Sequence, residues 1–469
     1  MDRGVPFIPT MLTVIGHIYR ERIFIRLMLT FMIGYFFIQY YLSITTTVTD
    51  TRDDWELELD EQLVQSYSTV FQELIDDEYL TFTSKTLVIG IQFLEYTTAL
   101  KQIGVMNTKS TKKNMFLSYR NESFDFQFLS HTSLDCCSNP GDFSLELLRT
   151  LKPEGYLVIH TQSKDDYSLN SLLNLFESLK LVHEREIVVD HWSVQGVREV
   201  VFMKEHGTRL WRRNQAQKHA GSCYVPTCKQ SLIQGLEPLM VKEPLQPRVL
   251  GIRNPKNMNY LTSMVDVSFK TSYVYIDVGA KSYGTSIGSW FKRVYPKQNK
   301  PFKIFAIEAD KQFHQEYRSK KKVTLLPFAA WVRNESLFFE INRLPNDSSE
   351  ERGSGMGRVQ SAHTSTTFMG DINKIQGFDF ADWVKNSFGE KDFVVVKMDV
   401  EGREFDLIAK MVESGAICLI DELFLECHYD PKERCCDGER SSSYQKGYEE
   451  CLELYRSLRD KGVFVHQWW

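Results

Sequence analysis

An uncharged, apolar stretch near the N-terminus constrains this chain more than any other feature. No charged residue occurs from Leu27 to Thr49, and Leu, Met, Phe, Ile and Tyr dominate the part up to Ile44. A helix needs about 20 apolar residues to cross the hydrocarbon core of a bilayer. The stretch begins too late for a simple signal peptide, and no clear cleavage site follows it. We therefore expect a transmembrane helix over residues 27–49 rather than a buried core helix.

The charges on either side of the stretch predict its orientation. Four arginines precede it, whereas the residues just after it are mainly acidic. Because positive charge stays on the cytosolic side, we expect a type II single-pass protein whose later residues lie in the lumen of the Golgi or another endomembrane. Glycosylation sequons at Asn121, Asn334 and Asn346 agree with a lumenal glycoprotein.

Length and composition indicate two globular units behind this anchor. The 469 residues exceed one ordinary domain, and 42% hydrophobic with 25% charged residues is typical of globular proteins. The net charge of −5 argues against nucleic acid as a partner, because such a partner needs a basic face. We divide the chain into a cytosolic N-terminus 1–26, the transmembrane helix 27–49, a stem 50–83, an α/β domain 84–205, a connector 206–255 and a second α/β domain 256–469.

Hydrophobic periodicity predicts the elements of these parts. The stem is typical of an acidic amphipathic helix that either packs on the first domain or self-associates. The proline-rich connector predicts little regular structure, and Glu350–Gly370 predicts a long loop of the kind that often forms lids. Alternating strands and helices predict a mostly parallel sheet in each domain. Strands are expected at 86–91, 124–129, 156–160, 187–189 and 197–203 in the first domain, the last two as a hairpin, and at 273–278, 303–307, 323–327, 336–341, 393–398 and 417–427 in the second. Helices of the second domain are expected at 287–295, 310–320, 379–387, 404–414 and 448–461.

Two successive strand ends of the second domain carry the pattern of a nucleotide-binding turn. Tyr-Val-Tyr-Ile-Asp-Val-Gly-Ala ends an apolar strand in Asp277, Gly279 and Ala280, and Gly284 follows before a helix. A glycine turn after a strand lets the backbone approach a nucleotide-like ligand closely, and an acid there can pair with a ligand ammonium. The next strand ends in Glu308, at the place where an acid usually binds ribose hydroxyls.

Two further strand ends add ionisable groups. Val-Val-Val-Lys-Met-Asp-Val-Glu-Gly places Lys397, Asp399 and Glu401 at the end of a buried strand, and Leu-Phe-Leu-Glu-Cys-His ends in Glu426 and His428. Ligands of open α/β sheets bind at the carboxyl ends of the strands. We therefore expect these acids and the histidine to converge on one polar site.

These four segments, from residue 270 to about 430, together resemble the FkbM-type methyltransferase family, with Asp-x-Glu-Gly as the most specific motif. The C-terminal half also looks like a plant family of membrane-anchored methyltransferase-like proteins. One departure from the family's pattern is the turn Lys281-Ser-Tyr-Gly284, which is one residue longer than the family's turn. The resemblance implies a Rossmann-like class I methyltransferase domain with a seven-stranded sheet. It also implies S-adenosylmethionine as cofactor, bound by Asp277, Gly279, Ala280, Gly284, Glu308 and Asp399.

The same resemblance implies methyl transfer to oxygen, on a sugar or a secondary metabolite. The expected lumenal location makes a glycan a natural acceptor. Asp399, Glu401 and His428 are the candidate catalytic residues, since a general base can take the hydroxyl proton. Two alternatives are an inactive lumenal scaffold for other enzymes of the secretory pathway and a type II glycosyltransferase, although the chain has no Asp-x-Asp motif.

The first domain resembles a class I methyltransferase that has degenerated. Leu87-Val-Ile-Gly has one glycine and no acid at the strand end where cofactor recognition belongs. We therefore expect a degenerate Rossmann-like domain that serves as a scaffold or acceptor-binding module.

Nine cysteines follow the apolar stretch, and an oxidising lumen would allow disulfides among them. Cys418 lies in an apolar run and is predicted to be a buried thiol. The C-terminal cysteines could bind zinc with His428, but they lack the paired Cys-x-x-Cys spacing of structural zinc sites. Disulfides are therefore favoured, and no metal site is expected, for the group Cys427, Cys435, Cys436 and Cys451.

Overall fold

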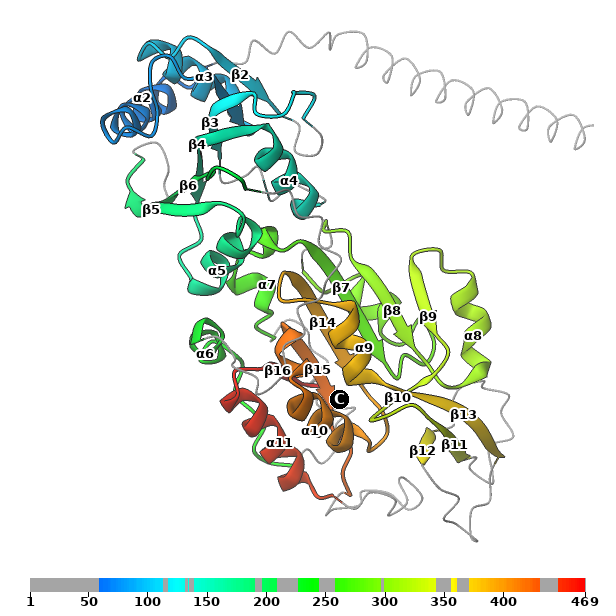
Figure 1. Cartoon of the computed structure of the whole chain (residues 1–469). Helices are drawn as coiled ribbons and strands as arrows, with labels where there is room; N and C mark the ends of the chain where they lie inside the picture. The colour runs from blue at the N-terminus through cyan, green and yellow to red at the C-terminus, as the bar shows by residue number, and fades with distance from the viewer. Residues whose placement is uncertain are drawn as a thin grey trace, which may run out of the picture. The chain divides into compact units, whose positions relative to one another are not determined.

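Three β-sheets and the helices beside them make up the described residues after Asp60 (Figure 1). The structure is a computed structural model that describes residues 59–112, 117–130, 134, 139–189, 196–208, 227–243, 258–296, 299–342, 356–360, 371–430 and 446–468. The predicted transmembrane helix and its flanks lie outside these residues. In the described part, no helix has both the length and the apolar character that a membrane crossing requires.

The first sheet has six strands in the order β2-β1-β3-β4-β6-β5. Its first four members are parallel, and β6 runs antiparallel to both of its neighbours. The predicted antiparallel hairpin is confirmed, but its first strand is Lys180–Ile187 and not 187–189. The edge strand β2 was not predicted because its sequence, Thr-Lys-Ser-Thr, is polar. The elements are β1 Thr86–Ile89, α3 Phe93–Gln102, β2 Thr108–Thr111, β3 Phe124–Leu129, α4 Pro140–Thr150, β4 Leu151–Thr161, α5 Asp166–Leu175, β5 Lys180–Ile187 and β6 Val197–Met203.

The predicted stem helix, α2 Glu61–Asp76, packs on this first sheet. Its apolar side chains Leu63, Tyr67 and Phe71 are buried. The Tyr67 hydroxyl lies 3.2 Å from Nδ1 of His160 on β4. Of the two possibilities left open by the sequence, the structure therefore shows packing on the first domain.

The second sheet is a six-stranded parallel sheet in the order β16-β15-β14-β7-β8-β9. Numbered along the chain, its strands follow the order 3-2-1-4-5-6 of the Rossmann fold. The expected seventh strand is absent from this sheet in the described residues, because the strand predicted at 336–341 pairs elsewhere. The strands are β7 Ser272–Val278, β8 Lys303–Ile307, β9 Val323–Leu326, β14 Asp392–Met398, β15 Glu422–Glu426 and β16 Phe464–Trp468.

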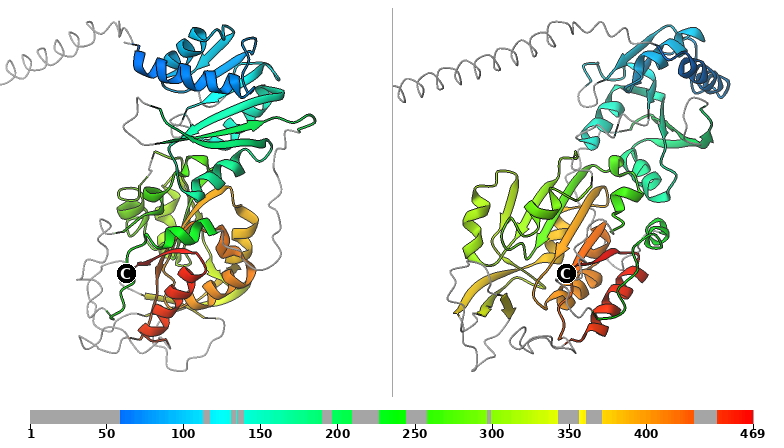
Figure 2. Two further views of the ribbon diagram at one scale, coloured as in Figure 1. Left: turned by 90° about the vertical axis from the view of Figure 1, so that its left-hand side faces the viewer. Right: turned by 180° about the vertical axis from the view of Figure 1, so that it is seen from behind.

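Helices cover both faces of the second sheet (Figures 1 and 2). Alternate residues of β7 point to opposite faces: Val274 and Ile276 join one core, Tyr273 and Tyr275 the other. The helices of the first core are α9 Phe380–Ser387, α10 Glu404–Ser414 and α11 Tyr448–Asp460. The second core receives side chains from α6 Thr227–Ile233, α7 Leu261–Met264, the 3₁₀-helix Val267–Phe269, the π-helix Ile287–Phe291 and α8 Lys311–Arg318.

A separate four-stranded sheet is inserted between β9 and α9, in the order β10-β13-β11-β12. The loop predicted over Glu350–Gly370 is wrong for its central residues, which form β12 and pair antiparallel with β11. The rest of that loop lies outside the described residues. The strands are β10 Ala329–Trp331, β11 Glu335–Asn342, β12 Met356–Gln360 and β13 Asp371–Asp379.

A buried carboxylate links the connector and the first domain to the second sheet. Asp421, which precedes β15, accepts a hydrogen bond of 2.8 Å from the Tyr167 hydroxyl of α5. Its Oδ1 also lies 3.3 Å from Lys229 Nζ and 3.4 Å from Lys270 Nζ. The expectation of an irregular connector is therefore wrong at α6, because this contact and the bond from Lys229 to the Ile420 carbonyl hold the helix in place.

We expect Asp421→Asn to destabilise the protein by about 3–5 kcal/mol, because it leaves two buried ammonium groups without their counter-ion. Thermal unfolding of the full-length protein measures the effect. Asp406→Asn, the same change at an exposed position on α10, is the control. Equal midpoints for the two variants would contradict the role assigned to Asp421.

Candidate functional site

An open cleft lies at the carboxyl ends of β7, β8 and β14. Its empty volume, adjoining solvent included, is about 740 Å³. Since β7 lies between the other two strands, the cleft has a β8 side and a β14 side. The β8 side is lined by Ile307, Glu308, Ala309, Asp310, Phe313, Phe328, Ala329 and Ala330, the β7 turn by Val278, Gly279 and Lys281, and the β14 side by Asp399, Val400, Glu401 and Arg403.

The β7 turn brings the strand ends together through the backbone. Gly279 has φ +77°, and a Cβ built on it would lie 1.8 Å from the carbonyl oxygen of Asp399. The amides of Gly279 and Ala280 both donate to the Ile307 carbonyl, at 3.0 and 3.1 Å. Glycine is therefore required at position 279 for β7, β8 and β14 to meet at one edge.

Asp277 lies beneath the cleft and does not line it. The Ser286 hydroxyl donates to its Oδ2, and Lys397 Nζ lies 3.7 Å from its Oδ1. Burial raises the pKa of Asp277 more than Lys397 and Ser286 lower it. The carboxylate predicted to pair with a ligand ammonium instead contacts the protein's own ammonium group.

Glu308 lines the cleft at the end of β8, as predicted. One of its oxygens accepts from the Lys281 amide and the other from the Asp310 amide, each at 2.6 Å. Burial raises its pKa to about 7, although the two amide donors favour the charged form. A carboxylate has about four acceptor positions, so each oxygen can still accept a hydrogen bond from a ligand.

Asp399, Glu401 and His428 converge on the β14 side. The His428 Nε2 lies 3.7 Å from Asp399 Oδ1 and 3.3 Å from Glu401 Oε2. Burial would lower the pKa of His428, but the carboxylates of Glu404, Glu401 and Asp399 raise it to about 10. Burial would raise the pKa of Asp399, but the cations Lys397 and His428 lower it.

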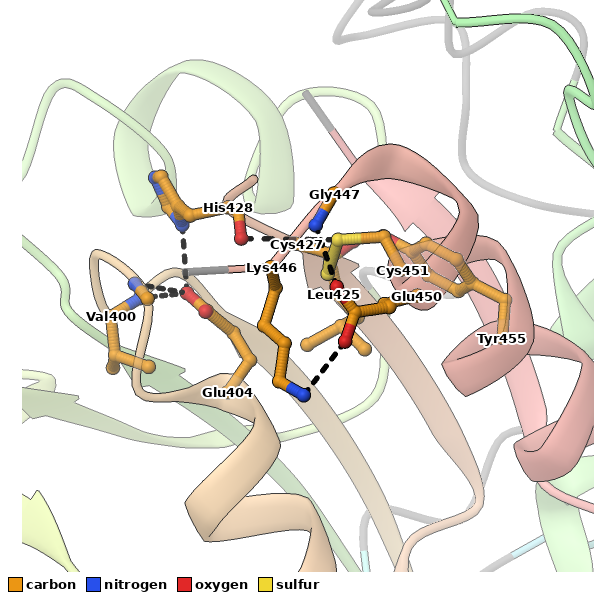
Figure 3. Close-up of a disulfide and its surroundings, with 11 residues drawn as sticks. Val400, Glu404, Leu425, Cys427, His428, Lys446, Gly447, Glu450, Cys451 and Tyr455 are labelled. Atoms are coloured by element: carbon orange, nitrogen blue, oxygen red, sulfur yellow. Dashed lines mark hydrogen bonds and ion pairs between the residues drawn. A yellow bond between two sulfur atoms is a disulfide. The ribbon is translucent and has the colours of Figure 1, made fainter. Parts of the chain in front are cut away.

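Two residues that the sequence reasoning did not assign hold this group in place. Glu404, fully buried at the start of α10, lies 2.8 Å from His428 Nδ1 and accepts from the Val400 amide at 3.1 Å (Figure 3). Lys397 donates to Asp399 Oδ2 at 3.1 Å. Lys397 belongs to the segment Val-Val-Val-Lys-Met-Asp-Val-Glu-Gly, and Glu404 follows two residues after its end, so this segment was the signal that could have pointed to both.

A disulfide between Cys427 and Cys451 ties the end of β15 to α11, directly beside His428 (Figure 3). The favoured disulfide interpretation is confirmed for this pair. The prediction of a buried thiol at Cys418 is wrong: this cysteine is disulfide-bonded, and it is only half-buried in the 3₁₀ turn Ala416–Leu419.

The predicted site residues thus fall into three groups. Gly279, Glu308, Asp399 and Glu401 line the cleft. Three others, Asp277, Ala280 and His428, are buried next to these residues. Gly284 is not among the lining residues; it lies in an open turn where nothing but the Ser282 side chain comes within 4 Å of an added Cβ.

The model of a protein family described as "Domain of unknown function (DUF7870)" matches residues 233–337 and 356–469. No curated protein matches the chain. The matched residues hold the whole second sheet and the cleft. The resemblance to the FkbM-type family stays a prediction.

Solved structures similar to part of the chain include three with 12–16% sequence identity. The N-methyltransferase NodS from Bradyrhizobium japonicum WM9, in complex with S-adenosyl-L-homocysteine, has 12% identity and a TM-score of 0.24 over 33% of this chain and 93% of that one. A SAM-dependent methyltransferase from Aquifex aeolicus has 16% identity and a TM-score of 0.23 over 32% and 95%. The [4+2]-cyclase SpnF has 13% identity and a TM-score of 0.23 over 29% and 81%. TM-scores this low do not support a fold assignment by themselves. The Rossmann-like fold of the second domain is assigned from its strand order.

The raised pKa of Glu308 makes stability depend on pH. Its folded-state pKa of about 7 exceeds the ordinary value of 4.5. The contribution of Glu308 to the free energy of unfolding is therefore fully present below pH 4.5, where the carboxyl is protonated, and is lost as pH rises through 7. Between pH 4.5 and 8 we expect the free energy of unfolding of the wild type to fall by about 3 kcal/mol relative to that of Glu308→Gln. Thermal unfolding across this range, with the exposed Glu413→Gln as control, measures it; a pH-independent difference would contradict the assignment.

Proposed function

We propose that the second domain is an S-adenosylmethionine-dependent methyltransferase that acts on a hydroxyl group. The observation that carries the proposal is the meeting of the Gly279 turn and the Glu308 carboxyl at one cleft edge. Glycine at the first strand and an acid at the second are the pattern by which Rossmann-type domains hold an adenosine.

The β8 side of the cleft suits the nucleoside part of that cofactor. Glu308 would accept hydrogen bonds from the ribose hydroxyls. The side chains of Phe313 and Phe328 supply aromatic surface for the adenine ring, as apolar pockets with a few polar groups do for cofactors in general. The cofactor would supply an electrophilic methyl group; the protein supplies position and a base.

The base is a carboxylate rather than the histidine. With a pKa of about 10, His428 carries its proton at neutral pH and cannot accept another. Asp399 is held ionised by Lys397 and His428 and, with Glu401, lines the β14 side of the cleft. A hydroxyl placed there would transfer its proton to one of these carboxylates as the oxygen attacks.

The acceptor and the location belong to the same proposal. The predicted anchor, the acidic flank after it and the disulfides support an oxidising lumen. In that compartment the acceptor would be a glycan or a hydroxylated secondary metabolite.

A second candidate is an inactive scaffold that binds other secretory enzymes. It is favoured by Asp277, whose carboxylate contacts Ser286 and Lys397 beneath the cleft, and by Lys281, which brings a cation to the cleft lining.

Isothermal titration of the detergent-purified full-length protein with S-adenosylhomocysteine separates the two. We expect saturable binding that Glu308→Gln weakens by about tenfold to a hundredfold, because a hydrogen bond to a charged acceptor contributes about 1.5–3 kcal/mol. Glu413→Gln should bind like wild type. A folded protein that shows no binding would exclude the enzyme and leave the scaffold.

A further inference from the structure

The side chains on the β14 side have the composition of a metal-ligand set. Two carboxylates and one imidazole, from Asp399, Glu401 and His428, place oxygen or nitrogen atoms that all lie within 4.8 Å of one another. They come from two strand ends of one rigid sheet, β14 and β15, rather than from a surface run of acids.

The separations suit a single ion. Two ligand atoms that each lie about 2.1 Å from a tetrahedral metal are about 3.4 Å apart. The distances from His428 Nε2 to Glu401 and Asp399 are 3.3 and 3.7 Å. Small side-chain rotations therefore bring the three groups to bonding distance of a common centre.

The histidine also has the outer partner that metal-binding histidines usually have. Glu404, itself fully buried, contacts Nδ1 at 2.8 Å (Figure 3). The other ring nitrogen, Nε2, faces Asp399 and Glu401. A carboxylate behind the imidazole fixes the ring orientation and raises its basicity as a ligand.

The carboxylates around the histidine favour binding of a cation. Asp399, Glu401 and Glu404 all lie within 4 Å of the imidazole. Lys397 contacts the other oxygen of Asp399, Oδ2, so Oδ1 faces the histidine. In the ion-free protein the protonated imidazole supplies one positive charge to this cluster. A divalent ion would displace the proton on Nε2 and supply two.

We propose that Asp399, Glu401 and His428 form a binding site for a first-row divalent transition-metal ion, with Glu404 as the residue that positions the imidazole. Carboxylates suit Mn²⁺ and imidazole suits Zn²⁺, so the mixed set favours these ions over Mg²⁺. Because Asp399 and Glu401 also line the cleft, a bound ion would lie where a hydroxylated ligand could reach it. The proposal concerns ion binding and does not depend on methyl transfer.

Titration of the metal-stripped, detergent-purified full-length protein with Mn²⁺, followed by the electron paramagnetic resonance of free Mn²⁺, tests the site. We expect saturable binding of one ion per chain, displaced by Zn²⁺ according to the usual order of affinities. The half-buried positions allow Glu401→Gln and Asp399→Asn to fold, and each should weaken binding at least tenfold. Glu413→Gln, an exposed change of the same kind, should leave it unaltered.

Glu404→Gln distinguishes a positioning residue from a ligand. This variant keeps all three ligands, so we expect its affinity for Mn²⁺ to fall by roughly 10- to 100-fold without a complete loss of binding. Circular dichroism confirms the fold of each variant. If wild type binds neither Mn²⁺ nor Zn²⁺ below millimolar concentration, or if Glu401→Gln binds Mn²⁺ as wild type does, the cluster is an ion-pair network and the proposal is wrong. The assay contains no cofactor or acceptor, so its outcome is independent of S-adenosylhomocysteine binding.

Discussion

The close approach of Gly279 to the carbonyl of Asp399 sets the geometry of the cleft. It joins the ends of β7 and β14 where any other residue would clash. Two nearby residues, Lys281 and Glu401, have φ of 53° and 51°, a conformation that costs non-glycine residues about 1–3 kcal/mol. The rigid parallel sheet holds both loops in these conformations. As a result the Lys281 amide points at Glu308, and the Glu401 carboxylate reaches His428.

Three carboxyl groups at neighbouring strand ends of one sheet edge therefore differ in their protonation and in their access to the cleft. Asp277 is buried against Lys397 and Ser286 and acts as a support. Glu308, with a pKa of about 7, is only partly ionised at neutral pH and lines the cleft. Asp399 stays ionised between two cations. Environment rather than residue type separates these roles, which explains why the sequence could name the acids but not assign them.

The sequence predicts this sheet better than it predicts the site. The apolar runs that become β7, β8 and β14 are long and bounded by turn residues, so their positions could be read from the pattern. The four-stranded sheet could not, because its strands pair across segments far apart in the chain, such as Phe338 with Lys374. The predicted helix 287–295 is instead a five-residue π-helix, Ile287–Phe291. Likewise, the first half of the strand expected at 417–427 is a 3₁₀ turn, since Gly415 ends α10 in the left-handed conformation.

The charge of the cleft lining also bears on the choice among ligands. Four carboxyl groups, from Glu308, Asp310, Asp399 and Glu401, face two cations, Lys281 and Arg403. Arg403 in addition lies over the Trp331 ring, 5.6 Å from its centroid, and pairs with Asp406. Such a lining repels the diphosphate of a nucleotide-sugar donor, because like charges brought together in a partly desolvated site are costly. A sulfonium or a divalent cation is attracted by the same field. The electrostatics of the ion-free cleft therefore favour a cationic cofactor over the glycosyltransferase alternative, and three of the four carboxyl groups, Glu308, Asp399 and Glu401, are ones that the sequence motifs had already marked.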